Sequence, residues 1–517
     1  MRSLFPLRGG VHPPRRKELS NHQPIERLPL PTRLTVPLQQ HIGAPAEPSV
    51  VVGESVLRGQ LIASPGSRLG APIHAPASGT VVAIEEHPLP HPLALHAPCI
   101  VIDCDLEQRQ APPLFEPVDD FTRLDSETII ERIRTAGIVG MGGAGFPSWV
   151  KLQTGGSRQI ETVILNGAEC EPYITCDDRL MRERADEIIR GLRILQHALQ
   201  AKRSLVAIEA DKPEAIAAIA EAIAAQDQQI ELVRLPTRYP AGGEKQLIQI
   251  MLGREVPFGK LSLDIGVVTH NVGTAHAVSR AVLHGEPLLE RVVTVTGAAV
   301  STPCNLLVPL GTPAFELLDH CGREAGGYQK LLCGGPMMGF ALYSEQVPIT
   351  KTVNCLLAAA AGELGSVDPE RPCIRCGQCA EACPVGLLPQ QLFWFAQARE
   401  LDRCEEHQIF SCIECGACAY VCPSRLPLVH YYRFAKQAIQ LRDHQREQAE
   451  QARRRFEFRE RRLERAKAEK AARHKERAQA VAGDSNDDKQ AAIQAALARA
   501  EAKKAARAST NEAEEKG

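Results

Sequence analysis

Eight of the 17 cysteines fall into two copies of one spacing, which is the strongest chemical signal in the sequence. Each copy reads C-x₂-C-x₂-C-x₃-C-P, and the copies occupy residues 373–384 and 412–423. Three thiolates on one turning loop can reach three irons of a cubane, while a helix carries the fourth cysteine away. The spacing therefore predicts two [4Fe–4S] clusters.

The fourth cysteine of each copy is expected to ligate the cluster held by the other copy, as in two-cluster ferredoxins. The ligands expected for cluster one are Cys373, Cys376, Cys379 and Cys422. Those expected for cluster two are Cys412, Cys415, Cys418 and Cys383. A pair of zinc sites is the alternative, but zinc commonly takes separated CxxC pairs, and each copy here has a third cysteine. The other nine cysteines show no metal spacing and are expected to be mostly small buried apolar residues rather than disulfides.

A second candidate site is the glycine-rich stretch Gly140-Met-Gly-Gly-Ala-Gly-Phe-Pro147. Its backbone N–H groups could form a nest for phosphate, Phe146 could stack on a ring, and Lys151 could add a positive charge. A Rossmann fingerprint would need a preceding strand, whereas residues 126–135 look helical. For an isolated motif, a tight structural turn would be the better interpretation.

The stretch is not isolated, because four segments resemble the NADH-binding flavoprotein subunit of respiratory complex I: residues 140–151, 166–172, 239–244 and 271–274. In that family the four segments surround FMN and the nicotinamide. The resemblance implies that the following residues contact FMN or NAD(H): Gly140, Gly142, Gly143, Gly145, Phe146, Lys151, Asn166, Glu169, Glu171, Tyr239, Gly242, Glu244, Asn271 and Thr274. The family's loop arginine is Met141 here, and its aspartate in the second segment is Ala168. For Glu169 and Glu244, a solvated or ion-paired surface carboxylate is as good an interpretation as a cofactor contact.

The complex I flavoprotein ends in a single-cluster motif, so the double motif points to another family. Over residues 1–440 the chain closely resembles the RnfC family, which belongs to the Rnf ion-translocating oxidoreductase complex. The likeness includes residues 9–13 (Gly-Gly-Val-His-Pro) and 334–339 (Gly-Gly-Pro-Met-Met-Gly). The resemblance implies a peripheral subunit on the cytoplasmic side of the inner membrane. Such a subunit passes electrons between NAD(H) and partner subunits, including a ferredoxin-like iron–sulfur subunit, while membrane subunits move ions.

A flavin is the adaptor that such an arrangement needs, since a hydride carries two electrons and each cluster accepts one. We therefore expect hydride exchange between NADH and FMN within residues 140–274, with single electrons passing through the two clusters in either direction. Two alternatives remain. One is a soluble reductase on the same scaffold, similar to cobalamin reductases, and the other is a non-catalytic electron conduit with a degenerate flavin fold.

The elements that must position these residues predict a multidomain α/β protein. Helical stretches (126–135, 182–201 and 213–225) alternate with strand-like runs (162–165 and 205–208), which indicates a largely parallel sheet. The expected order is an extended segment (1–34), a barrel-sandwich β domain (35–115), an FMN/NADH-binding α/β domain (120–290), a small β-grasp, ligand-binding-like domain (291–345), a helical ferredoxin-type two-cluster domain (350–440) and a charged tail (441–517).

The β domain resembles the barrel sandwich of biotinyl and lipoyl domains, which carry their cofactor on a lysine. No lysine occurs between Lys17 and Lys151, so a swinging-arm carrier is excluded. The tail is rich in Ala, Glu, Lys, Arg and Gln, so we expect a solvated helix or disorder, interrupted at residues 483–488.

The bulk composition limits the partners. A net charge of −2 gives no global field for nucleic acid. No run approaches the roughly 18 apolar residues of a membrane span, and the N-terminus lacks the apolar stretch of a signal peptide. We therefore expect a cytoplasmic protein whose membrane contact comes only through partner subunits.

Overall fold

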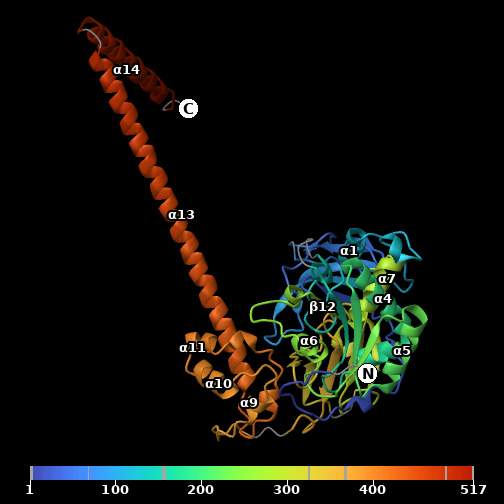
Figure 1. Cartoon of the computed structure of the whole chain (residues 1–517). Coiled ribbons are helices and arrows are strands. Elements are labelled where there is room, and N and C mark those ends of the chain that lie inside the picture. The colour runs from blue at the N-terminus through green and yellow to red at the C-terminus, as the bar shows by residue number, and fades with distance from the viewer. Residues whose placement is uncertain are drawn as a thin grey trace. The chain divides into compact units, whose positions relative to one another are not determined.

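The computed structural model describes residues 4–67, 69–153, 159–323, 327–365, 369–483 and 486–514. The chain forms two compact units, Met1–Lys436 and Gln437–Gly517 (Figure 1). The first unit contains the sandwich domain, the parallel sheet, a second larger sheet and the cysteine motifs.

The sandwich domain consists of two small sheets with a shared core. One sheet has the order β2 (Arg33–Pro37), β8 (His96–Cys104), β7 (Gly79–Pro88) and β4 (Ser55–Val56), and the other has β3 (Glu47–Pro48), β5 (Leu61–Ser64) and β6 (Ile73–His74). Alternate side chains of a strand point to opposite faces, so one face of each sheet can be apolar. Leu34 and Ile100 of the first sheet and Ile62 and Ile73 of the second all lie in this core.

The flavoprotein-like core is a four-stranded sheet in the order β11 (Glu231–Leu235), β10 (Arg203–Glu209), β9 (Thr162–Gly167) and β12 (Val267–Asn271). Every pairing is parallel, as predicted. Apolar residues follow one another along β9 because both faces are covered. Val163 and Leu165 pack in one core cluster and Ile164 packs in the other.

Helices cover both faces of this sheet (Figure 1). They are α1 (Ser126–Thr135), α2 (Ser148–Leu152), α3 (Cys176–Glu183), α4 (Ala185–Leu199), α5 (Pro213–Gln226), α6 (Glu244–Leu252) and α7 (Val272–His284). The predicted helices at 126–135 and 213–225 are confirmed. The single helix predicted over 182–201 is wrong: Arg184 leaves the helical region with a φ of −132°, so α3 ends and α4 begins there.

The second sheet has six strands in the order β1 (Glu26–Arg27), β14 (Cys304–Pro309), β13 (Glu290–Thr296), β17 (Cys355–Ala359), β15 (Lys330–Cys333) and β16 (Phe340–Ala341), with α8 (Ala314–His320) beside it. β17 corrects the expectation that residues 350–440 are only helical. Its five residues are all buried between β13 and β15. A short apolar run fits a buried strand as well as a buried helix, so periodicity could not distinguish them.

The cysteine motifs lie among short helices: α9 (Gln378–Ala382), α10 (Pro389–Gln397), α11 (Leu401–Glu406), α12 (Ala417–Tyr420) and the start of α13 (Leu428–Gly483). Three cysteines of each motif precede or enter α9 or α12, and the fourth follows that helix. This is the loop-then-helix arrangement that the spacing predicts.

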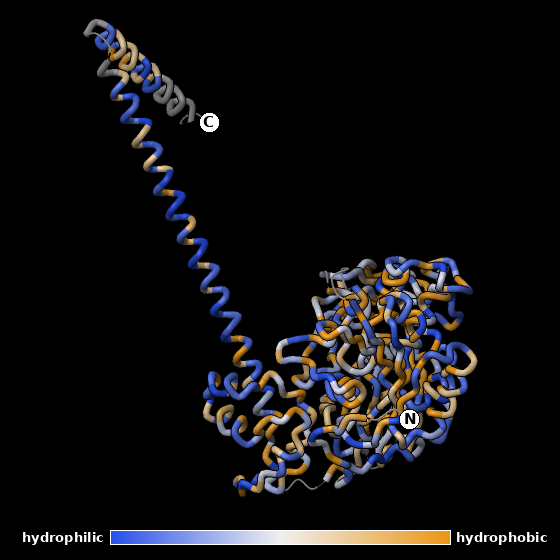
Figure 2. The backbone as a smooth tube through the Cα atoms, viewed as in Figure 1, coloured by the Kyte–Doolittle hydropathy of each residue, from blue (hydrophilic) through white to orange (hydrophobic). Residues whose placement is uncertain are grey.

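The second unit holds the rest of α13 and α14 (Asn486–Glu514). Figure 2 shows α13 as mostly hydrophilic, and its arginines form ion pairs one turn apart, such as Arg453 with Glu457 at 3.3 Å. α13 ends at Gly483 and α14 begins at Asn486, which confirms the predicted interruption. In the part of the chain that the structure describes, no helix is both long and apolar enough to cross a membrane.

Candidate functional site

The candidate flavin site begins at the carboxyl ends of β9 and β12, where open α/β sheets bind their ligands. Asn166 and Asn271 end these strands as direct partners in the sheet register. Asn166 Nδ2 donates to Gly242 O at 2.9 Å, which ties the second resembled segment to the third. Asn271 caps α7 by accepting from Gly273 N at 2.8 Å. The fold thus brings together segments about 100 residues apart.

The glycine-rich loop lies against this edge. Gly140 N donates to Phe146 O at 2.8 Å, which closes the loop, and Met141 N donates to Thr274 Oγ1 at 2.9 Å, which fixes it to the first turn of α7. A Cβ at Gly142 would lie 3.3 Å from Asn271 Cβ, whereas one at Gly143 would meet nothing within 4 Å. The loop is therefore pressed against β12 at Gly142 and open to solvent at Gly143.

Lys151 and Glu244 form a charged pair beside the loop. Lys151 Nζ lies 3.2 Å from Glu244 Oε2 and donates to Thr269 O, while Ser262 Oγ donates to Glu244 Oε1 at 2.7 Å. Burial alone would raise the pKa of Glu244, but the Lys151 ammonium and these hydrogen bonds hold it below its usual value. The ion-paired interpretation therefore describes Glu244 in this structure.

His270, next to this pair, is a buried polar group that the sequence reasoning missed. Burial and the Lys151 charge lower its pKa to about 3, so the ring is neutral, and Nε2 has no hydrogen-bond partner. An open glycine cradle, an adjacent ammonium and an orphaned imidazole nitrogen fit a phosphate-bearing polar cofactor. The two departures from the complex I pattern, Met141 and Ala168, are both buried.

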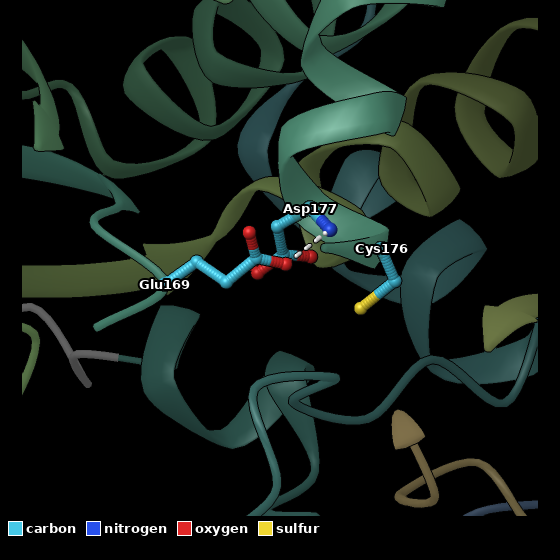
Figure 3. Close-up of side chains that lie close together, drawn as sticks. All are labelled: Glu169, Cys176 and Asp177. Carbon is cyan, nitrogen blue, oxygen red and sulfur yellow. Dashed lines mark hydrogen bonds between the residues drawn. The ribbon is translucent and has the colours of Figure 1, made fainter. Parts of the chain in front are cut away.

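Glu169 lies farther inside than a surface carboxylate would. Its oxygens accept from Asp177 N at 2.7 Å and Asp178 N at 3.3 Å, so it caps the first turn of α3 (Figure 3). Its side chain is 3% exposed, and burial raises its pKa to about 8, although the charges of Lys17 and Lys212 oppose the shift. Burial also raises the pKa of Asp177, which accepts from Asn271 Nδ2 at 2.6 Å. Glu169 thus supports the site from behind.

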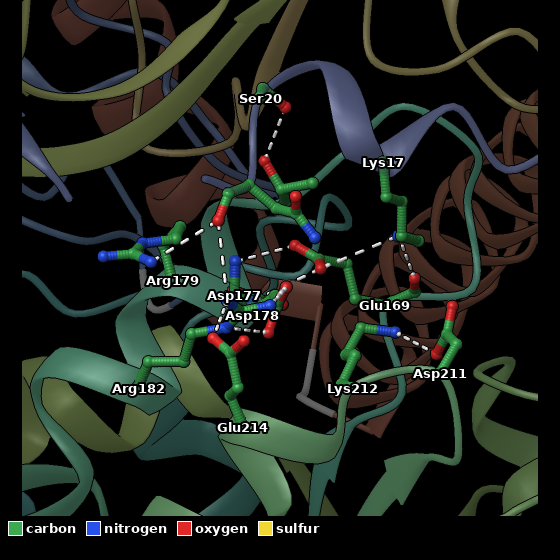
Figure 4. Close-up of polar contacts among 12 residues, drawn as sticks. Lys17, Ser20, Glu169, Asp177, Asp178, Arg179, Arg182, Asp211, Lys212 and Glu214 are labelled. Carbon is green, nitrogen blue, oxygen red and sulfur yellow. Dashed lines mark hydrogen bonds and ion pairs between the residues drawn. The ribbon is translucent and has the colours of Figure 1, made fainter. Parts of the chain in front are cut away.

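Lys17 was missed because the N-terminal segment gave no signal beyond the nearby Gly-Gly-Val-His-Pro run. Its ammonium donates to the carbonyls of Glu169, Glu171 and Ile174 at 2.7, 3.1 and 2.6 Å (Figure 4). Lys212, also missed, donates to Ala168 O at 2.7 Å. Two buried ammonium groups therefore hold the backbone of the second resembled segment.

Glu171 and Tyr239 face the cysteine motifs rather than the glycine loop. Glu171 Oε1 accepts from Met337 N at 2.7 Å and Met338 N at 3.1 Å, and burial raises its pKa. Tyr239 Oη donates to Cys415 O at 2.7 Å. The fourteen residues thus divide into a group around the glycine loop and a group directed at the cluster domain.

The fourth cysteine of each motif lies with the other motif's three. Cys383 lines one cavity together with Cys412, Cys415 and Cys418. Burial raises the pKa of the Cys415 thiol to about 12, and Cys412 and Cys383 beside it add to the shift. Burial likewise raises the pKa of Cys379, with contributions from Cys422 and Cys376.

The sulfur spacing also separates the two metal interpretations. Tetrahedral zinc with Zn–S bonds of about 2.3 Å needs sulfurs about 3.8 Å apart. Among the described residues, no three of these cysteine sulfurs lie within 4.8 Å of one another. The donor sets therefore fit a larger cluster. Of the nine other cysteines, seven are buried, as expected: Cys99, Cys176, Cys304, Cys321, Cys333, Cys355 and Cys404.

Four domain families match consecutive parts of the chain. They are the RnfC barrel sandwich hybrid domain (residues 5–107), the Nuo51 FMN-binding domain (133–280), the SLBB domain (292–341) and the 4Fe-4S dicluster domain (372–426). The matches confirm the barrel-sandwich, flavin-binding and two-cluster domains, and the SLBB match coincides with the small β domain expected there.

Curated relatives match almost the whole chain and are named as the RnfC component of an ion-translocating oxidoreductase complex. The one from Serratia proteamaculans is 48% identical over 97% of this chain and 70% of its own length. Those from Salmonella gallinarum and Pectobacterium carotovorum are 49% and 50% identical and are covered over 73% and 65% of their lengths, by 97% and 96% of this chain. The chain thus spans about two thirds of their length. A solved NAD⁺-reducing [NiFe]-hydrogenase matches 57% of this chain and 59% of its own at 20% identity with a TM-score of 0.44, too weak a likeness to support an inference.

Proposed function

Because this chain belongs to the RnfC family of ion-translocating oxidoreductase complexes, we propose that it is the electron-transfer subunit of such a complex. In this role it exchanges electrons with NAD(H) through FMN and with a partner subunit through two [4Fe–4S] clusters. The observation that carries the proposal is that an FMN-binding domain and a dicluster domain pack within one compact unit.

The flavin is held at the carboxyl edge of the parallel sheet. A flavin takes both electrons of a hydride and releases them one at a time. Gly143, which is open to solvent, allows the backbone to approach phosphate, and Lys151 supplies a positive charge. Asn166 and Asn271 fix the loops that surround the site. The remaining contacts expected from the resemblance belong to this same proposal.

The clusters are held in crossed sets. Cluster one takes Cys373, Cys376, Cys379 and Cys422, and cluster two takes Cys412, Cys415, Cys418 and Cys383. The cavity that Cys383 shares with the second motif supports the second set. The closeness of Cys422 to Cys379 supports the first.

The subunit sits peripherally on the cytoplasmic side of the inner membrane, bound by partner subunits that include a ferredoxin-like iron–sulfur protein. Electron flow through these partners is coupled to ion movement in the membrane subunits. A soluble reductase similar to cobalamin reductases would carry the same cofactors, and an electron conduit would lack flavin. Cofactor content and membrane association therefore separate the three functions.

The test is anaerobic purification of the full chain, alone and from membranes that contain the other subunits. We expect about eight iron, eight acid-labile sulfide and one FMN per chain, and NADH-dependent dye reduction. The chain should sediment with membranes only when its partner subunits are present. Zinc without sulfide would refute the cluster assignment, absence of flavin would favour the conduit, and no partner-dependent sedimentation would favour the soluble reductase.

A further inference from the structure

The flavin-binding core and the cluster domain meet in one small apolar cluster, here named the junction. Its buried members are Val11, Tyr239, Ala382, Cys415 and Ala417, and Cys170 and Met337 pack against them. Tyr239 and Cys170 belong to two of the segments that resemble the complex I flavoprotein. The junction therefore connects the flavin-binding segments directly with the second cysteine motif.

Polar contacts fix the junction. Tyr239 Oη donates to the carbonyl of Cys415 at 2.7 Å, in a buried position. Val11 pairs with Tyr239 through two backbone hydrogen bonds of 2.8 and 3.0 Å, and Gly10 N donates to Ala382 O at 2.9 Å, next to Cys383. These bonds reach Cys415 itself and the residue next to Cys383, two of the ligands assigned to cluster two.

The equivalent glycines of the two motifs show the same asymmetry. Gly377 and Gly416 each follow the second cysteine of their motif and have φ values of +81° and +76°. A Cβ at Gly416 would lie 2.9 Å from Met337 O, in the loop that Glu171 holds, whereas a Cβ at Gly377 would meet nothing within 4 Å. Only the second motif is pressed against the flavin-binding core.

Burial follows this pattern. Cys383, Cys415 and Cys418 are less than 10% exposed, whereas Cys376 is exposed and Ile374 beside it is 68% exposed. The first motif thus presents its loop to solvent, where another protein can approach it.

We infer that Tyr239 is a positioning residue that couples the flavin site to the cluster of Cys383, Cys412, Cys415 and Cys418. This inference rests on the proposed function. The buried cluster exchanges electrons with the flavin site, and the exposed one exchanges them with the partner subunit. Two one-electron passages balance one NADH oxidised to NAD⁺ and a proton, and the partner takes up both electrons.

The hydrogen bond to Cys415 also tunes that cluster. A donor near a cluster ligand stabilises the more negative, reduced cluster and raises its midpoint potential. Tyr239→Phe removes the donor and keeps the packed ring, so the potential of the buried cluster should fall while that of the exposed cluster stays. Tyr420→Phe, at a 49% exposed tyrosine of the same motif, is the matched control and should shift neither.

The experiment is an EPR redox titration of the purified full chain, with flavin content and rapid-mixing reduction by NADH measured alongside. Gly416→Ala and Gly377→Ala form a second pair with the same backbone strain. Gly416→Ala should slow reduction of both clusters by NADH, and Gly377→Ala should leave reduction of the buried cluster at its normal rate. The inference is overturned if Tyr239→Phe shifts neither cluster, shifts only the exposed one, or loses flavin with both potentials intact. Absence of clusters or flavin from the unaltered chain would instead refute the proposed function.

Discussion

At position 143 the backbone takes a φ of +109°, and the space beside it is open. The residue therefore costs nothing as glycine and leaves the loop accessible to a phosphate. At position 169 the opposite holds, because the carboxylate is enclosed and bonded to the first turn of α3. Two residues that the resemblance gives one role thus meet different physical demands.

Gly143→Asp should abolish flavin binding while leaving both clusters in place. The carboxylate would occupy the open space and repel a phosphate, and a loss of 1.4 kcal/mol or more lowers affinity at least about tenfold. FMN content and NADH–dye reduction measure the effect. Gly53→Asp is the control, since Gly53 also has a positive φ and open space but lies in the sandwich domain. Normal FMN content in Gly143→Asp would place the flavin elsewhere.

Glu169 should make stability depend on pH. Its pKa is about 8 in the folded chain and near 4.5 when unfolded, so the folded state binds more protons between these values. Stability then falls as pH rises from about 5 to 8. Glu169→Gln should flatten that decline in the thermal midpoint, because the amide does not titrate. An unchanged slope would mean that Lys17 keeps Glu169 ionised throughout.

At the scale of elements, α9 and α12 decide which sulfurs meet. Each helix is short and begins after a glycine with positive φ, so it turns the chain and delivers its fourth cysteine to the other motif. The crossed sets depend on the packing of α9 against α12, since neither motif holds four ligands at one cavity by itself.

Cys383→Ala should therefore damage the cluster of the second motif and largely spare that of Cys373, Cys376, Cys379 and Cys422. EPR of the reduced variant, with iron content, is the measurement. NADH oxidation by an artificial acceptor should remain within about twofold, since such acceptors take electrons at the flavin. Cys404→Ala, at a buried cysteine outside both motifs, should keep both signals. Loss of only the first cluster would reverse the assignment.

At the scale of the whole molecule, the cofactor sites and the charged tail belong to separate compact units. The tail helices expose their charged side chains and bury no core of their own (Figure 2). Their stability comes from helix propensity and from ion pairs between successive turns. The folding of the cofactor domains therefore does not need them.

Deletion of residues 441–517 should leave iron, sulfide and FMN content unchanged and keep NADH–dye reduction within about twofold. Cofactor analysis and steady-state assays on matched preparations decide this. A truncated chain that lost either cofactor would assign the tail a role in folding the first unit.

The sequence by itself determined the chemistry that depends on local spacing. Cysteines two or three residues apart sit on one loop in any fold, so the two motifs could be recognised without a structure. The parallel sheet was also predictable, because strands and helices alternate and each has its own periodicity. The glycine loop gained meaning only from three further segments that resemble those of one family.

Only the tertiary structure decided which distant residues meet. Lys17 reaches the carbonyl of Glu169 across 152 residues, and Tyr239 reaches that of Cys415 across 176. Such contacts leave no periodic pattern, because each depends on how several packed elements are oriented together. The same reason explains β17, whose five apolar residues become a central strand only because β13 and β15 flank them. The motifs identify the cofactors, and packing determines which cluster faces the flavin site.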